Sequence, residues 1–169
     1  KEAERVAVAA MMAAAEDYEA ALGVSEFWVL INREQYQRAE NLLQRCIEDR
    51  EPQYAAWCQG GLGWMRSHEG KLAEAETLLV PAIETWKERG THAPLVSEFS
   101  ELLGYVRLKQ GRMPEARDLF KQALAIRDRT PERTQHILAM NLYSLAAISA
   151  GLEDSEQAEL YFSRALEID

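Results

Sequence analysis

Apolar and small side chains follow helical spacing along this chain of 169 residues, and the whole pattern returns at a longer interval. Three small residues, Gly63, Gly104 and Ala146, occupy corresponding places that are separated by 41 and then 42 residues. Alanines recur twelve and nineteen positions after them, at Ala75, Ala116, Ala158 and at Ala82, Ala123, Ala165. A period in this range predicts a solenoid of stacked supersecondary units.

No stretch alternates apolar and polar residues with the spacing of a strand, so the predicted fold class is all-α. The pattern predicts helices at about 2–22, 24–32, 35–49, 53–68, 72–89, 95–109, 114–129, 132–150 and 154–168. Prolines stand where helices should begin, at Pro52, Pro94 and Pro131. Glycines mark the turns between paired helices, at Gly70, Gly111 and, displaced by two residues, Gly151. The chain therefore divides into a divergent N-terminal part with a first repeat, and three further repeats, at 1–50, 51–93, 94–130 and 131–169.

The small residues should lie where the two helices of one unit cross, because they permit helix axes about 8–10 Å apart. Gly63 and Gly104 each cost about 1 kcal/mol of helix propensity relative to alanine, and a close crossing explains that cost. Pro81 falls inside a predicted helix, where it should remove a hydrogen bond and kink the axis.

The pairs Leu62-Gly63, Leu103-Gly104 and Leu145-Ala146, together with the alanines that follow them, resemble the signature of the tetratricopeptide repeat. The run 115–127 is similar to the longer variety of this repeat found in kinesin light chains and in bacterial regulators. The resemblance extends over residues 53–169 and weakens before them, where Phe27 stands at the place of Gly63. It implies a right-handed superhelical solenoid of antiparallel helix pairs.

In the family that the chain resembles, the first helix of each repeat lines a concave groove that holds a partner. The residue after each crossing site faces that groove, and so do residues one or two turns before it and one turn after it. The resemblance therefore implies a face formed by Trp28, Trp57, Gly60, Gly61, Trp64, His68, Glu98, Glu101, Tyr105, Lys109 and Tyr143. Gly60 and Gly61 should leave room beside the tryptophans. The alternative for the aromatic rings is that they only pack against neighbouring units.

The family's clamp for a C-terminal carboxylate is not expected, because Gly60, Trp64, Glu101 and Tyr105 stand where that clamp needs lysine, arginine or asparagine. Arg66 and Arg107 occupy a site where the family usually has an aromatic residue. We expect their stems to pack and their guanidinium groups to reach acidic residues.

Composition limits the class of partner. The formal net charge of −9 argues against non-specific nucleic-acid binding, which depends on neutralising phosphates. The longest apolar run, at 6–15, is too short to cross a bilayer, and the acidic residues beside it argue against a secretory leader. The sequence does not begin with methionine, and we expect it to be a piece of a longer protein.

Cys46 and Cys58 are the only cysteines, and their number and spacing do not suggest a disulfide framework. Cys46 is expected to be a small core residue and Cys58 a half-buried one. A reducing compartment, and hence a cytoplasmic location, is the expectation that follows.

Catalytic chemistry is not expected. His68, His92 and His136 share no metal-ligand spacing with one another or with the cysteines. The run 60–63 is glycine-rich, but it lacks the lysine and serine or threonine of a phosphate loop and should lie within a helix. The sequence therefore predicts neither an enzyme nor a site for a metal or cofactor.

The leading expectation is a binding module for a protein or peptide that forms the sensor or scaffold part of a larger, bacterial-type protein. One alternative is self-assembly through the last helix, where Leu160, Tyr161 and Ile168 could stay partly uncovered. The other is a small-ligand sensor, as in regulatory ATPases or transcription regulators, with a pocket near Trp57, Gly60 and Trp64.

Overall fold

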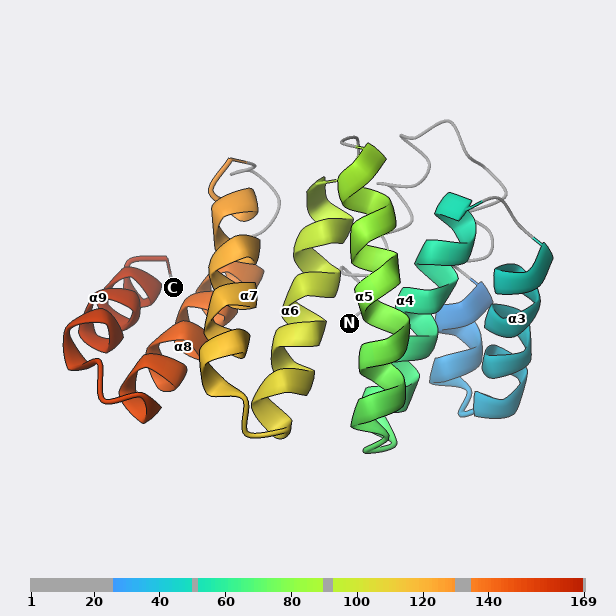
Figure 1. The fold of residues 1–169 in the computed structure, drawn as a ribbon, viewed down its shortest axis with the longest axis horizontal. Coiled ribbons are helices and arrows are strands. Elements are labelled where there is room, and N and C mark those ends of the chain that lie inside the picture. Colours follow the sequence, from blue (N-terminus) through green and yellow to red (C-terminus); the bar gives the residue numbers. More distant parts are fainter. Residues whose placement is uncertain (1–25, 50–51, 90–92, 130–134, 169) are drawn as a thin grey trace. The chain divides into compact units, whose positions relative to one another are not determined.

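A computed structural model describes residues 26–49, 52–89, 93–129 and 135–168, and these residues form helices and turns without any strand (Figure 1). A short helix at 26–32 comes first. It is followed by α3 (Tyr36–Asp49), α4 (Pro52–His68), α5 (Leu72–Arg89), α6 (Ala93–Lys109), α7 (Met113–Arg127), α8 (Gln135–Gly151) and α9 (Ser155–Leu166). The predicted all-α class is confirmed. The helix expected at 2–22, His92 and Pro131 lie outside the described residues.

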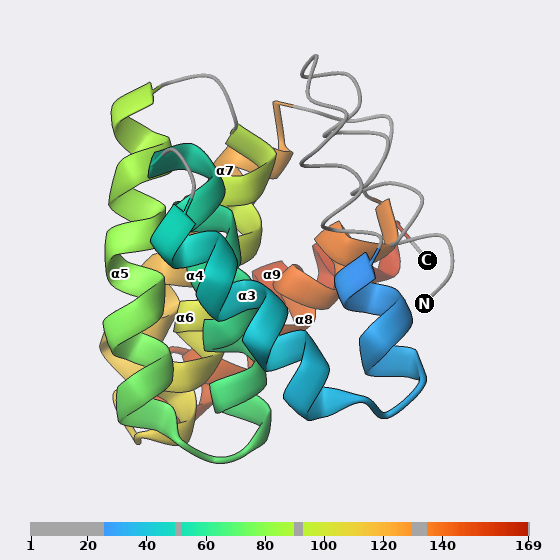
Figure 2. The same ribbon diagram turned by 90° about the vertical axis from the view of Figure 1, so that its right-hand side faces the viewer.

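The chain divides into two compact units, Lys1–Leu62 and Gly63–Asp169. In the described part of the first unit, helix 26–32 and α3 form a hairpin, seen in blue and teal in Figure 2, and the beginning of α4 completes the unit. Its buried side chains include Phe27, Leu30, Leu43, Ala56 and Trp57. None of the helices within the described ranges is both long and apolar enough to cross a membrane.

A disulfide joins α3 to α4 in this first unit. Cys46 and Cys58 are bonded, with their Cα atoms 6.1 Å apart. The expectation of two unlinked thiols is therefore wrong. The link between the two helices is short, so α4 folds back along α3 and brings residues separated by twelve positions together. Cys58 is buried, not half-buried as expected.

The second unit contains the helix pair α6 and α7 and the pair α8 and α9, together with α5 and the end of α4. Glycines allow two of the close crossings, as the sequence predicts. A Cβ atom on Gly63 would lie 2.8 Å from Cγ of Leu79, and one on Gly104 would lie 3.0 Å from the ring of Phe120. α5 continues through Pro81, which lies on its exposed side.

The turns between paired helices repeat one backbone geometry. Positive φ angles occur at Glu34, Gly70, Gly111 and Glu153, with values of 57°, 77°, 77° and 61°. At each turn the next residue donates its N–H to a carbonyl five positions earlier, as Lys71 does to Arg66 at 2.9 Å and Asp154 does to Ser149 at 2.9 Å. This is the Schellman ending of a helix. The prediction that Gly151 marks the last turn is wrong, because the left-handed residue is Glu153 and Gly151 ends α8.

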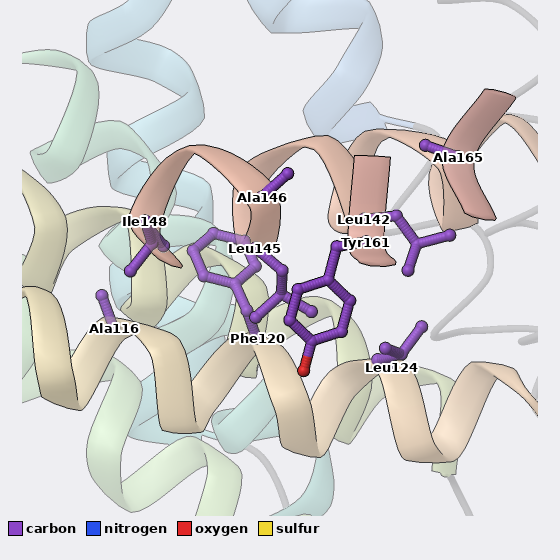
Figure 3. Packing of buried hydrophobic residues seen from close by; sticks show 9 residues of the cluster. All are labelled: Ala116, Phe120, Leu124, Leu142, Leu145, Ala146, Ile148, Tyr161 and Ala165. Carbon is purple, nitrogen blue, oxygen red and sulfur yellow. The ribbon is translucent and has the colours of Figure 1, made fainter. Parts of the chain in front are cut away.

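The core of the last two pairs lies between α7, α8 and α9, as Figure 3 shows. Phe120 and Leu124 of α7 pack against Leu142, Leu145 and Ile148 of α8, and all five are buried. The equivalent residues of α9 are Phe162 and Leu166, which are 50% and 57% exposed. Equivalent residues of the repeat are therefore buried on α7, where α8 covers them, and exposed on α9.

Candidate partner-binding surface

The second unit carries two similar pairs of side chains on the first helices of its repeats. Trp64 and His68 lie one helical turn apart on α4, with ring centroids 4.0 Å apart and an interplanar angle of 37°. The Nδ1 atom of His68 also lies 2.9 Å from the carbonyl oxygen of Trp64, which accepts a hydrogen bond from it. His68 is exposed and Trp64 is half-buried.

Tyr105 and Lys109 occupy the corresponding positions on α6. Tyr105 is 43% exposed, and the Nζ atom of Lys109 lies 5.2 Å from the centroid of its ring. This distance is within the range of a cation–π contact. On α8 the same two positions hold Ala147 and Gly151, which are both exposed and small. We call the surface formed by Trp64, His68, Tyr105 and Lys109 the first-helix face.

Glu101, which the sequence places on this face, is held inside the fold. Its carboxylate oxygens accept hydrogen bonds from Nε and Nη2 of Arg127 at 2.5 and 2.9 Å. Nδ2 of Asn141 donates to the same carboxylate at 2.8 Å. The Glu101 side chain is only 18% exposed and that of Arg127 is 7% exposed. Glu101 therefore joins α6, α7 and α8, and Glu98, one turn earlier on α6, is half-buried.

On α8, the repeat positions of Glu98 and Glu101 hold apolar side chains, Met140 and Tyr143. Met140 is among the most exposed apolar residues, and Tyr143 is half-buried with its ring 5.8 Å from that of Phe162. Tyr143 occupies the repeat position of Glu101, so a buried ion pair in one repeat is replaced by an aromatic contact in the next. Tyr143 therefore contributes both to packing and to the surface.

The predicted residues of the first unit contribute mainly to its core. Trp57 is 8% exposed, and its ring meets that of Phe27 at 6.0 Å in an edge-to-face arrangement. Trp28 is half-buried, and its ring lies 5.1 Å from the same Phe27 ring. Phe27 thus fills the place of the small crossing residue and anchors both tryptophans.

The expectation that Gly60 and Gly61 leave room for a partner is wrong. Both glycines are buried, and a Cβ atom on Gly61 would lie 3.2 Å from Cδ2 of Leu43. Gly61 is thus needed for the close approach of α3 to α4. The structure also places residues 60–63 within α4, as expected, where the backbone is helical and does not form a phosphate loop.

Arg66 and Arg107 behave as the sequence predicts. The guanidinium group of Arg66 reaches Glu74 at 3.1 Å and Glu69 at 3.0 Å, and that of Arg107 reaches Glu76 at 2.7 Å. A hydrogen bond from Lys71 lowers the pKa of Glu69, with a smaller contribution from Arg66. Arg66 thus ties α4 to α5 within one repeat, whereas Arg107 ties α6 to α5 of the preceding repeat.

Among the described residues, no group of histidine, cysteine and carboxylate side chains could hold a metal ion. A cavity of about 530 Å³ in the first unit is lined by helix 26–32 and α3, and by none of the predicted site residues. Residue spacing alone did not identify the Glu101–Arg127–Asn141 cluster. Its members are far apart in sequence, and only Glu101 belongs to the predicted face.

Comparisons with known proteins agree with this architecture. The family model described as tetratricopeptide repeat matches residues 95–169. BtubC (BKLC) from P. vanneervenii aligns with a TM-score of 0.77 and 18% identity over 88% of this chain, which spans 62% of that protein chain. A putative kinesin light chain from Podosopora anserina aligns with a TM-score of 0.66 and 18% identity, covering 97% of this chain and 82% of the other.

A mutant of MamA aligns with a TM-score of 0.54 and 21% identity, covering 90% of this chain and 98% of the other. No curated protein matches the sequence. At these identities, the solved structures show a shared fold.

Proposed function

Residues 95–169 are tetratricopeptide repeats and the described chain has the same all-α repeat fold; from this premise we propose that the protein is a non-catalytic module that binds a protein or peptide. The first-helix face of the second unit is the proposed contact surface. In this proposal the module serves as the sensor or scaffold part of a larger, bacterial-type protein, and its partner is neither a nucleic acid nor a membrane.

One observation carries the proposal. Two neighbouring first helices present an aromatic ring and a nitrogen-bearing side chain at the same two repeat positions, Trp64 with His68 and Tyr105 with Lys109. Rings of this kind lose little conformational entropy on binding and act as anchors in protein interfaces. The face therefore combines apolar area with groups that can donate hydrogen bonds.

The main test compares a double variant on this face with a matched aromatic variant outside it. Trp64→Ala combined with Tyr105→Ala removes both anchors, whereas Tyr36→Ala removes a 54% exposed ring of α3. Each protein is immobilised and used to select binders from a library of displayed random peptides. We expect the wild type and Tyr36→Ala to enrich the same peptides and the double variant to lose them by at least tenfold.

Circular dichroism of the same samples shows whether the double variant is folded. A folded double variant that still enriches the wild-type peptides would show that Trp64 and Tyr105 only pack. A pull-down from the source cell with the same three proteins then identifies the natural partner.

Self-assembly is a second candidate, supported by the apolar surface of α9. Leu160, Phe162 and Leu166 are all at least half exposed. Of the residues expected to be uncovered, only Leu160 is exposed, because Tyr161 is buried in the core cluster and Ile168 packs against it. Light scattering over a range of concentrations tests this candidate. A monomer at every concentration would remove it, and a Phe162→Ser variant should dissociate any dimer.

The small-ligand alternative loses its expected pocket, since Trp57 and Gly60 are both buried. The proposed cytoplasmic location loses its main argument, because it depended on cysteines that remain free, and the structure joins Cys46 to Cys58. Labelling of thiols in the source cell, before lysis, tests the compartment. Labelling of both Cys46 and Cys58 indicates a reducing compartment, and labelling of neither cysteine indicates an oxidising compartment.

A further inference from the structure

The disulfide lies in the smaller of the two compact units of the chain. The first unit, Lys1–Leu62, is smaller than the second, and units of about 60 residues are only marginally stable through burial alone. Cys46 belongs to α3 and Cys58 to α4, so the bond connects two elements that both border the small core of this unit.

The packing around the bridge differs from that in the later repeats. Cys46 occupies the repeat position of Ala82 and Ala123, and both alanines are fully buried without any covalent link. In the first repeat, the small crossing residue is replaced by Phe27. The bridge therefore occurs in the one described repeat that lacks the usual small-residue crossing.

We propose that the Cys46–Cys58 disulfide is a redox-controlled brace that determines whether the first repeat stays folded, while the second unit folds in either redox state. The second unit contains no cysteine, so oxidation and reduction act on the first unit alone. This inference does not depend on the proposed binding function.

The chemistry of release is a thiol–disulfide exchange with a dithiol reductant. A thiolate of the reductant attacks the sulfur of Cys46, which is the more exposed of the two half-cystines, and the Cys58 sulfur leaves as a thiolate. The second thiol of the reductant then attacks the mixed disulfide and releases Cys46. Two electrons pass to the protein, which gains two thiols, and the reductant becomes a disulfide.

The size of the effect follows from the loop that the bridge closes. Cys46 and Cys58 are twelve positions apart. Closing a loop of this length restricts the unfolded chain enough to favour the folded state by a factor of about 100. Reduction should therefore increase the open population of the first unit about a hundredfold, and that of the second unit hardly at all.

Hydrogen exchange followed by mass spectrometry tests the proposal on the full chain, with and without dithiothreitol. We expect amides of α3 to exchange about a hundredfold faster after reduction, whereas amides of α6, α7 and α8 keep their rates. The internal comparison between the two units separates opening of the first repeat from general unfolding.

Cys46→Ala is the matched variant, because alanine is the residue that the later repeats have at this position. It cannot form the bridge but keeps the small side chain that the packing requires. We expect its α3 amides to exchange at the rate of the reduced wild type, with no response to dithiothreitol. Equal protection of α3 in the oxidised and reduced wild type would overturn the proposal, as would equal acceleration in both units. Oxidised-like protection of α3 in Cys46→Ala would also overturn it.

Discussion

The left-handed residues at the repeat turns allow a prediction whose sign reverses between two repeats. Gly111 and Glu153 occupy the same turn position, with φ angles of 77° and 61°. An L-residue with a side chain costs about 1–2 kcal/mol in this conformation, whereas glycine adopts it freely. We therefore expect Glu153→Gly to stabilise the protein and Gly111→Ala to destabilise it.

The magnitudes follow from the local surroundings. A Cβ atom on Gly111 would meet nothing within 4 Å, so Gly111→Ala tests the backbone alone, and we expect a loss of about 1 kcal/mol. Glu153→Gly removes the same strain but makes the unfolded chain more flexible, so we expect a smaller gain of about 0.5 kcal/mol.

Urea unfolding followed by circular dichroism measures these free energies. Glu159→Gly is the control, because it makes the same chemical change at an exposed position inside α9, where glycine should cost about 1 kcal/mol. The reasoning would be refuted if Glu153→Gly destabilised the protein as much as Glu159→Gly does, or if Gly111→Ala left stability unchanged.

Three further predictions concern packing in the second unit, each measured by the same unfolding assay. Phe120→Ala should cost about 3–4 kcal/mol and Phe162→Ala less than half of that, since these equivalent rings are 6% and 50% exposed; similar losses would contradict the burial argument. Gly63→Val should cost about 2 kcal/mol, because even a Cβ atom there would collide with a leucine of α5, and an unchanged stability would show that the helices can move apart. Arg127→Met should cost about 3 kcal/mol, because it leaves the buried Glu101 carboxylate without its charged partner and with the Asn141 amide still donating to it. Adding Glu101→Gln should restore part of the loss; additive losses would mean that the side chains of Glu101 and Arg127 are not coupled.

Most of the fold could be predicted from sequence because the same small and apolar residues recur at the same positions in successive repeats. The predicted helices 72–89 and 95–109 agree closely with α5 and α6, and Gly63 and Gly104 lie at close helix crossings as predicted, although the side chains nearest to them are Leu79 and Phe120. The last turn was misplaced at Gly151, since glycine is the usual signal for a left-handed residue and the chain uses Glu153 instead. The repeat spacing itself puts Glu153, 42 positions after Gly111, at the place of the turn glycine.

The candidate site could be predicted less well. Sequence spacing identifies which residues lie on the first helices, but it does not show which of them the fold already uses. Glu101 was predicted to face a partner, yet it binds Arg127, whose place at the end of α7 depends on how the helices pack. Likewise, the sequence predicts Gly61 to lie on the surface, whereas in the structure it packs against Leu43. Residue spacing within one helix does not show a contact of this kind, because it joins two different helices.

A comparison of the repeats within this one chain separates what folding requires from what it leaves free. At the crossing positions 63 and 104 the residue is glycine, because a neighbouring side chain occupies the space that a Cβ atom would need. One position later, folding sets no such limit, and the chain has Trp64, Tyr105 and Ala147. Large rings appear there on α4 and α6, although an exposed alanine serves on α8. The fold thus accepts a small residue at this position, which supports the proposal that the rings on α4 and α6 contact a partner.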